Sequence, residues 1–394
     1  MDAYKEELDE LLNIKVSDYK EEKSKEWDFI LDKIRSEGIV LYGSGGFGKR
    51  TLKGLREVGV EPLGFADNNS TVWNKSVEGL TVYSPAEVVE KFPEALYMVT
   101  IWSDKIGHPI NEVRQILSAK KNVLISSFFP LYYKYPEIFL PYFSLDFPGK
   151  TIEDVALVLK AYSLFEDDTS RMEFLAQIRM RMQGNADGLS GATGSQYHFA
   201  NELFLLNEND SIIDIGAFDG DTLKDFINIR NGEFKKYIAF EPDPGNFKKL
   251  EDYVLTLPDD IRNKISGEQL AVSDTNKTIT FAADGSLQSA YSEEGNITVD
   301  CIALDDHVFN DHPTYIKMDA EGAEPEIIKG ASKIIQQFLP ILAVSVYHQY
   351  DHLWSLPLQI KTLSNDYKFF LRPLCKASWD LICYAVPKNR LSFK

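Results

Sequence analysis

The residues best suited to chemistry surround a glycine-rich turn in the second half of the chain. A short apolar run delivers Asp214 into a turn that contains Gly216 and Gly220. Glycine at these positions permits positive φ angles and lets a ligand lie directly against the backbone. About twenty residues further on, the apolar run 237–240 ends in Glu241, where a carboxylate could hold the ribose hydroxyls of a nucleoside. The pattern predicts a nucleoside site, and its spacing fits NAD and S-adenosylmethionine equally well.

Two later apolar runs also end in polar residues. One ends in Lys317-Met318-Asp319, and because side chains alternate along a strand, Lys317 and Asp319 should share one face. The next run ends in His348. The carboxyl ends of parallel strands meet at one edge of a sheet, so Asp319 and His348 should converge there. We expect one of them to act as a general base, with Lys317 orienting Asp319, unless Lys317 and Asp319 form only a structural ion pair.

We expect no metal at these strand ends. Asp319 and Glu321 offer carboxylate oxygens that a hard divalent ion would accept, and they form a weaker alternative. His348 and His352 have the spacing of a helical metal-binding pair, but His348 should lie on a strand, which argues against that pair. The pattern therefore favours a metal-free site.

A separate glycine-rich turn lies near the start of the chain. Gly43, Gly45 and Gly48 fit the G-x-G-x-x-G spacing between an apolar strand and a helix. Asp67 follows the next strand, at the distance expected of a ribose-binding carboxylate. The segment also resembles the small nucleotide-binding domains of bacterial sugar-modifying enzymes, so it could bind a nucleotide or a nucleotide-sugar. Alternatively, the turn binds nothing and its domain serves packing or oligomerisation.

Strands that alternate with helices must position both turns. We expect an α/β protein with two Rossmann-like domains joined by a helical bridge. The predicted regions are a helical segment (1–36), a nucleotide-binding domain (37–150), a helical bridge with a Gly-rich loop (151–195) and a second α/β domain (196–394). The strands expected in the first α/β domain are 39–42, 61–66, 96–101 and 122–125. An aromatic, Pro-rich connector (128–148) should follow them.

The second α/β domain carries a longer series of strands. Its expected parallel strands are 211–215, 237–241, 268–272, 314–319 and 341–348, followed by the closing pair 367–372 and 381–386. Residues 278–282 and 297–303 should form an inserted hairpin, and residues 325–338 should form one helix. Five parallel units closed by a hairpin resemble the seven-stranded sheet of S-adenosylmethionine-dependent methyltransferases.

Four blocks in this domain, taken together, resemble the FkbM family of methyltransferases. They are Asp214-Ile-Gly216-Ala-Phe-Asp-Gly220, Phe240-Glu241-Pro-Asp-Pro244, Ala271-Val-Ser-Asp274 and Ile316-Lys317-Met-Asp319-Ala-Glu321-Gly-Ala-Glu324. The blocks keep the family's order, and the likeness covers roughly residues 196–387. The resemblance implies transfer of a methyl group from S-adenosylmethionine to an acceptor hydroxyl, often on a sugar, a glycan or a secondary metabolite.

The resemblance also implies a set of cofactor-binding residues. These are Asp214, Gly216, Gly220, Glu241, Asp274 and Tyr197. In this reading Glu241 holds the ribose, Asp274 is a weaker candidate for the adenine edge, and Tyr197 could close over the cofactor. Phe218 stands where many members carry Asn, which puts any contact from that side chain in doubt.

Charge and apolar content limit the partners. The chain has 42 basic and 60 acidic residues, a formal net charge of -18, which argues against binding to nucleic acid or anionic lipid. Residues 1–25 lack the apolar stretch of a signal peptide, and the longest apolar runs fall far short of the ~20 residues that span a bilayer. We therefore expect a cytoplasmic protein without membrane insertion, which acts on a small-molecule or glycan acceptor and could form a homo-oligomer.

Two other classes stay open at this point. The first is an NAD(P)-dependent oxidoreductase that uses the turn at Gly43 together with Asp67. No Tyr-x-x-x-Lys or other dehydrogenase motif follows that turn, and this class leaves Asp214, Glu241 and Asp319 unexplained. The second is a non-catalytic nucleotide-binding protein. Binding of S-adenosylmethionine, rather than NAD, would decide in favour of the methyltransferase.

Overall fold

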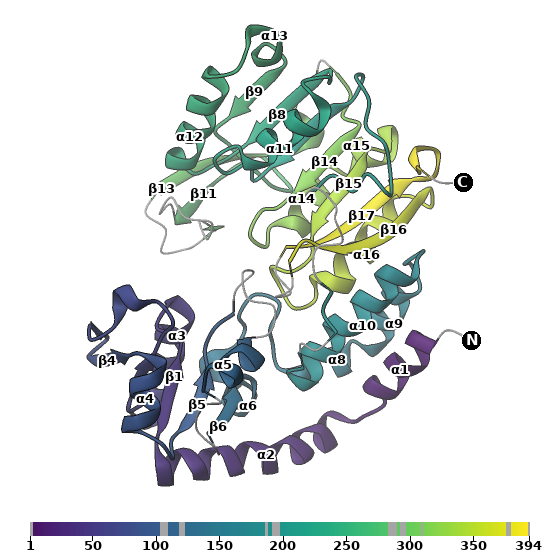
Figure 1. Ribbon diagram of the computed structural model, residues 1–394. Helices are drawn as coiled ribbons and strands as arrows, with labels where there is room; N and C mark the ends of the chain where they lie inside the picture. Colours follow the sequence, from purple (N-terminus) through teal and green to yellow (C-terminus); the bar gives the residue numbers. More distant parts are fainter. Residues whose placement is uncertain are drawn as a thin grey trace. The chain divides into compact units, whose positions relative to one another are not determined.

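A computed structural model of the protein shows two compact units (Figure 1). The residues it describes are 3–102, 109–117, 123–185, 188–190, 198–282, 290–291, 297–307, 309, 311–375 and 380–392. The first unit comprises the chain up to Val155, Leu175–Gly191 and a short segment at Cys375, and the second comprises the rest. The predicted bridge, 151–195, is thus divided between the two units. Among the described helices, none has the length and apolar character needed to cross a membrane.

Two helices precede the first sheet, in the region predicted to be one helical segment. α1 spans Ala3–Leu12 and α2 spans Val16–Glu37. α2 ends at Gly38, which has a φ angle of +81° and donates its N–H to the carbonyl of Ile34 at 2.9 Å. The buried face of α2 consists of Tyr19, Trp27, Leu31 and Ile34.

A six-stranded sheet is the centre of the first unit. Its strands are β1 (Ile39–Tyr42), β2 (Gly64–Ala66), β3 (Ser76–Val77), β4 (Leu80–Tyr83), β5 (Leu96–Val99) and β6 (Leu124–Ser127). They lie in the order β3-β4-β2-β1-β5-β6, and every neighbouring pair except β3–β4 is parallel. The helices between them are α3 (Gly46–Glu57), α4 (Pro85–Lys91) and α5 (Pro109–Leu117), with the short 3₁₀ helix η1 (Ser70–Val72). Four of these strands, β1, β2, β5 and β6, overlap the strand regions predicted, and β3 and β4 are additional.

Short helices fill the region after this sheet. They are α6 (Phe129–Lys134), α7 (Pro136–Phe139), α8 (Pro148–Glu153), α9 (Val155–Tyr162) and α10 (Asp168–Gln183). The predicted connector, 128–148, thus contains two helices. Five of its aromatic residues are buried in the core of the first unit: Phe128, Phe129, Tyr132, Tyr133 and Phe139. Among them, Tyr132 stacks on Phe139 with ring centroids 4.5 Å apart.

The second unit is built on a seven-stranded sheet. Its strands are β7 (Ser211–Ile215), β8 (Lys236–Phe240), β9 (Ile265–Glu268), β14 (Tyr315–Met318), β15 (Ile341–Ser345), β16 (Tyr367–Pro373) and β17 (Leu381–Pro387). They lie in the order β16-β17-β15-β14-β7-β8-β9. All neighbouring pairs are parallel except those that involve β17, which runs antiparallel to β15 and β16. Four of the five predicted parallel strands and the closing hairpin form as expected, and β14 is the middle strand, between β15 and β7.

Helices connect the parallel strands of this sheet. They are α11 (Asp221–Arg230), α12 (Pro244–Leu255), α13 (Asp259–Arg262), α14 (Glu324–Gly330), α15 (Ser332–Phe338) and α16 (His352–Leu363), with the 3₁₀ helices η2 (Leu304–Asp306) and η3 (Lys388–Arg390). The single helix predicted over 325–338 is divided into α14 and α15. The backbone leaves helical geometry at Ala331, which has φ and ψ angles of -111° and 9°.

A small sheet follows β9 and changes one predicted element. Its strands are β10 (Ala271–Val272), β11 (Lys277–Ala282), β12 (Ala290–Tyr291) and β13 (Ile297–Ile302), in the order β10-β13-β11-β12. β11 and β13 are antiparallel, as the inserted hairpin predicts. The strand predicted at 268–272 does not form as one element, because its first part ends β9 and its second part pairs with β13. Of the turn predicted at 286–296, the structure describes only Ala290–Tyr291, which form β12.

Candidate active site

The turn between β7 and α11 packs tightly against the end of β14. Gly216 has a φ angle of +74°, and its N–H donates to the carbonyl of Phe240 at 3.0 Å. A Cβ atom added at Gly216 would lie 1.9 Å from the carbonyl oxygen of Asp319. Only glycine therefore permits this approach, which brings the turn and Asp319 into direct contact.

Gly220 starts helix α11 from the other end of the same turn. It is the N-cap residue and has a φ angle of +85°. A Cβ atom at Gly220 would lie 2.9 Å from a methyl group of Leu250. Between the two glycines, Phe218 also has a positive φ of +48°, a conformation that Asn adopts more readily than Phe. The turn therefore imposes a left-handed backbone at each of these three positions.

The carboxylate of Glu241 lies across this turn. Its Oε2 accepts the N–H of Phe218 at 2.8 Å, and its Oε1 accepts the N–H of Asp243 at 2.8 Å. Glu241 is only 6% exposed, and burial raises its pKa to about 7, although the two backbone hydrogen bonds oppose the shift. An ionised carboxylate can accept about four hydrogen bonds, so acceptor capacity remains for a ligand.

Asp214 and Lys317 form a buried ion pair on the two central strands. They are register partners on β7 and β14, and Lys317 Nζ lies 3.0 Å from Asp214 Oδ1. Lys317 also donates to the carbonyl of Gly216 at 2.7 Å, and the hydroxyl of Tyr237 donates to Asp214 Oδ2 at 2.6 Å. Burial alone would lower the pKa of Lys317, but Asp214 and Asp319 raise it above its ordinary value, so the ammonium stays charged. Lys317 is therefore closer to Asp214 than to Asp319, whose Oδ2 lies 4.0 Å away.

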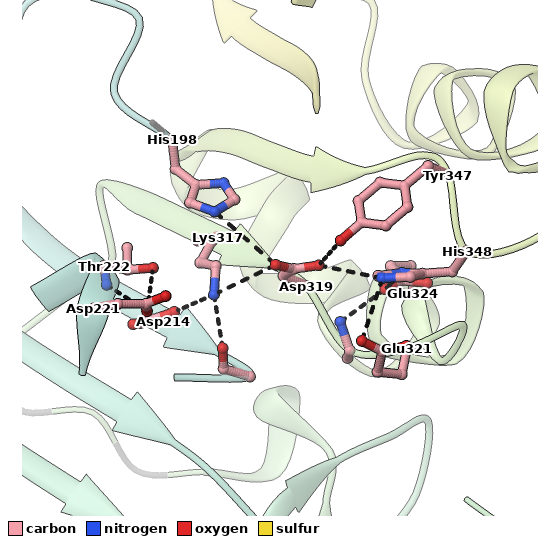
Figure 2. A network of polar contacts seen from close by, with 12 residues as sticks. His198, Asp214, Asp221, Thr222, Lys317, Asp319, Glu321, Glu324, Tyr347 and His348 are labelled. Atoms are coloured by element: carbon pink, nitrogen blue, oxygen red, sulfur yellow. Dashed lines mark hydrogen bonds and ion pairs between the residues drawn. The ribbon is translucent and has the colours of Figure 1, made fainter. Parts of the chain in front are cut away.

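Asp319 is the centre of a polar network at the ends of β14 and β15 (Figure 2). Its Oδ1 faces Tyr347, whose hydroxyl lies at 3.4 Å, and His348, whose Nε2 lies at 3.4 Å. Its Oδ2 has longer contacts, to Lys317 Nζ and His198 Nε2, both at 4.0 Å. Burial would raise the pKa of Asp319, but the positive charges of Lys317 and His348 lower it to about 2. The Asp319 side chain keeps a quarter (25%) of its surface exposed, so a substrate can reach it.

His348 connects Asp319 to a buried glutamate. Its Nδ1 lies 2.8 Å from Oε1 of Glu324, and its Nε2 lies 3.9 Å from Oε1 of Glu321. Burial would lower the pKa of His348, but Glu324 and Asp319 raise it to about 9. His352 reaches the same glutamate, with its Nδ1 3.4 Å from Oε2 of Glu324. The His348/His352 spacing noted in the sequence therefore brings both rings to one carboxylate.

His198 belongs to the network, although the sequence pattern did not indicate it. The residue is 7% exposed, and burial together with Lys317 lowers its pKa to about 4. Its backbone carbonyl accepts a hydrogen bond from the hydroxyl of Tyr315 on β14. An isolated His outside any predicted strand has no periodicity that would place it beside Asp319.

Comparisons with known proteins identify the domain around this network. Residues 214–371, which begin at Asp214 and include the network except His198, match the methyltransferase FkbM domain family. The second unit contains an FkbM methyltransferase domain. Of the predicted classes, this match supports the S-adenosylmethionine-dependent methyltransferase.

One solved structure shares the fold over almost the whole chain. The crystal structure of methyltransferase FkbM from Methylobacillus flagellatus KT is similar with a TM-score of 0.75 and 19% identity, over 93% of this chain and 99% of that chain. Precorrin-6y C5,15-methyltransferase from Geobacter metallireducens GS-15 gives a TM-score of 0.30 and 12% identity, over 50% of this chain and 93% of that chain. A comparison with curated protein sequences gives no significant match. The whole-chain likeness thus establishes a shared fold with an FkbM methyltransferase.

The cofactor-binding roles expected of Asp274 and Tyr197 stay predictions. Asp274 follows β10 of the small sheet, where it pairs with Lys277 at 3.1 Å and Lys329 at 2.8 Å. These two lysines lower its pKa below the ordinary value. The adenine role of Asp274 therefore stays a prediction for a carboxylate that already has two cationic partners. Tyr197 lies outside the described residues.

In the first glycine-rich turn, Asp67, the predicted ribose-binding carboxylate, accepts hydrogen bonds from the turn itself. Oδ2 of Asp67 accepts the backbone N–H of Ser44 at 2.9 Å and its hydroxyl at 2.6 Å. Gly43 has a φ angle of +118°, and a Cβ atom at Gly48 would lie 2.0 Å from the carbonyl oxygen of Gly43. Around Gly45 nothing lies within 4 Å of an added Cβ atom. Packing of strand against helix accounts for the outer two glycines, and nucleotide binding at this turn stays a prediction.

Proposed function

We propose that the protein transfers the methyl group of S-adenosylmethionine to a hydroxyl group of a sugar, a glycan or a secondary metabolite. The contact between Gly216 and the carbonyl of Asp319 carries this proposal. It joins the glycine-rich turn, where a nucleoside donor would bind, to the carboxylate at the end of β14. An acceptor hydroxyl bound at Asp319 would therefore lie beside the donor.

The residues around the turn suit the nucleoside part of this cofactor. The buried carboxylate of Glu241 can only accept hydrogen bonds when ionised, and the paired hydroxyls of a ribose are donors of the matching kind. Its two backbone hydrogen bonds, to Phe218 and Asp243, fix its orientation and leave acceptor positions free. When bound, S-adenosylmethionine supplies a methyl group on a positively charged sulfur, which leaves as a neutral thioether.

Asp319 is the group best placed to receive the proton of the acceptor. With a pKa lowered to about 2 it is ionised at neutral pH, and its Oδ2 lies 4.0 Å from both Lys317 Nζ and His198 Nε2. His348, with a pKa raised to about 9, already carries its proton and so cannot accept another. Of the two bases predicted, Asp319 is therefore favoured. A weak base suffices, because the hydroxyl proton becomes strongly acidic as the oxygen gains the methyl group.

Lys317 and His348 then act on the charge of Asp319. Both are cations on the network, and together they keep the carboxylate ionised inside the protein. Lys317 was predicted to orient Asp319, and its nearer partner, Asp214, suggests that it acts mainly by holding the two strand ends together. The first glycine-rich turn does not enter the proposed activity, since Asp67 is engaged by Ser44.

Two measurements test the proposal. S-adenosylhomocysteine should bind the wild-type protein in a calorimetric titration, and Glu241→Ala should weaken this binding about 100-fold, the effect of losing hydrogen bonds to a charged group. Glu251→Ala, which removes an exposed carboxylate from α12, is the matched control and should bind normally. In a mass-based screen over nucleotide sugars and lipid-linked glycans, Asp319→Asn should lose methyl transfer but keep S-adenosylhomocysteine binding. Wild-type protein that binds no S-adenosylhomocysteine, or full transfer by Asp319→Asn, would refute the proposal.

A further inference from the structure

The imidazole of His348 has one nitrogen without a hydrogen bond. Its side chain is 1% exposed, and Nδ1 lies 2.8 Å from Glu324 Oε1, which also accepts the N–H of Ala320 at 2.8 Å. A carboxylate oxygen only accepts, so Nδ1 carries a proton and donates it. Nε2 has no hydrogen-bond partner among the residues that the structure describes. In the metal-free protein Nε2 carries a proton, and a metal ion that displaces this proton would bind the lone pair of the buried atom.

Two carboxylates face this nitrogen. Oδ1 of Asp319 lies 3.4 Å from Nε2, and Oε1 of Glu321 lies 3.9 Å from it. Two atoms bound to one divalent ion at about 2.1 Å are separated by about 3.0 Å when adjacent and about 4.2 Å when opposite. Both observed distances fall within that range. Each carboxylate oxygen is therefore within reach of an ion bound at His348 Nε2.

The surroundings match those of a metal ligand set. A histidine that binds a metal through one nitrogen commonly donates its other N–H to a carboxylate, which fixes the ring, and Glu324 has that position here. Glu321 has a φ angle of +50°, in the left-handed region, and the following Gly322 has +104°. The Asp319 and Glu321 side chains are 25% and 26% exposed, so an ion can enter from solvent.

We propose that Asp319 Oδ1, Glu321 Oε1 and His348 Nε2 bind a divalent cation, with Glu324 as the outer partner that orients His348. Two carboxylate oxygens and one imidazole nitrogen favour an ion of the Mn²⁺ class, which accepts both donor types. Three protein ligands leave positions for water and for an oxygen of the acceptor. This last part rests on the proposed function, whereas binding of the ion itself does not. Oδ2 of Asp319 stays free to accept the hydroxyl proton.

Mn²⁺ alone tests the site on the full-length protein. The protein is first dialysed against a chelator and then titrated with MnCl₂, with bound and free ion measured by electron paramagnetic resonance. We expect one ion per chain, and a loss of affinity of at least about 10-fold in Glu321→Gln and in His348→Gln. The matched controls are Glu326→Gln, an exposed carboxylate on α14, and His312→Gln, a histidine stacked on Phe338; both should bind as the wild type does.

The outcomes separate this inference from the proposed function. His348→Gln removes a buried ring, so circular dichroism must show that it is folded; Glu321→Gln changes a partly exposed side chain and carries the test if His348→Gln unfolds. Wild-type protein that binds no Mn²⁺, or a Glu321→Gln variant that binds it as well as Glu326→Gln does, overturns the metal site. S-adenosylhomocysteine is titrated into the same samples. If the protein binds S-adenosylhomocysteine but not Mn²⁺, the metal site alone is refuted. If it binds Mn²⁺ but not S-adenosylhomocysteine, the proposed function alone is refuted.

Discussion

Replacing Lys317 by methionine should strongly destabilise the second unit. The substitution keeps the length of the side chain but leaves Asp214, which is 0% exposed, with the hydroxyl of Tyr237 as its remaining side-chain donor. Removing one partner of a buried ion pair costs about 3–5 kcal/mol, because the other charge stays buried. At about 2–4 °C per kcal/mol for a domain of this size, the midpoint of thermal unfolding should fall by roughly 10 °C.

A second substitution distinguishes the cost of the unpaired Asp214 carboxylate from the cost of lost packing at Lys317. The double variant Lys317→Met with Asp214→Asn buries no unpaired charge, so it should recover most of the lost stability. Lys329→Met is the matched control, because that lysine is 71% exposed and its pairing with Asp274 should contribute less than about 1 kcal/mol. Thermal unfolding followed by circular dichroism measures all four proteins. A Lys317→Met midpoint within about 2 °C of the wild type, or a double variant no more stable than the single one, would refute the reasoning.

Three further predictions concern both glycine-rich turns. Gly216→Ala should lower the midpoint of thermal unfolding by more than about 5 °C, because its Cβ atom would clash with the Asp319 carbonyl. The control Gly46→Ala, whose Cβ atom would have no heavy atom within 4 Å, should leave the midpoint unchanged, and equal midpoints for the two variants would contradict the prediction. Calorimetric affinity for S-adenosylhomocysteine should fall as the pH drops through about 7, where Glu241 becomes protonated; a constant affinity from about pH 8 to 6 would exclude Glu241 as the ribose ligand. Asp67→Ala should cost about 1–3 kcal/mol in thermal stability and leave that affinity unchanged; a weaker affinity would link the first turn to the cofactor.

The fold was predictable wherever an apolar run was bounded by turn residues. β7, for example, was expected at 211–215 and forms over Ser211–Ile215. The pair β3–β4 was missed because two-residue strands such as Ser76–Val77 carry almost no periodic signal. The strand expected at 268–272 was wrong as one element, since each of its two ends finds a different partner strand. Pairing of this kind depends on tertiary contacts that one sequence does not contain.

The site was predictable in part for the same reason. Asp319 and His348 were expected to converge because both follow parallel strands, and their side chains lie 3.4 Å apart. Glu324 was noted as the last residue of a family block, and its carboxylate is fully buried beside His348. His198 precedes the first strand of the domain and was not considered. Both residues reach the network through the packing of connecting segments, which leaves no regular spacing in the sequence.

The distribution of charge explains why the network has this form. During methyl transfer the positive charge on the donor sulfur is lost and positive charge develops on the acceptor oxygen. A protein carboxylate beside the donor should therefore be neutralised by a cation, and one beside the acceptor should keep its negative charge. Lys317 lies 3.0 Å from Asp214, below the glycine-rich turn, and 4.0 Å from Asp319. It therefore neutralises the donor-side carboxylate more completely than the acceptor-side one. Asp319 keeps its charge and an open oxygen, and a cation bound at His348 and Glu321 would balance that charge without covering Oδ2. Under the proposed function, the buried Asp214–Lys317 pair is thus both a structural link between two strands and the element that directs the remaining negative charge toward the acceptor.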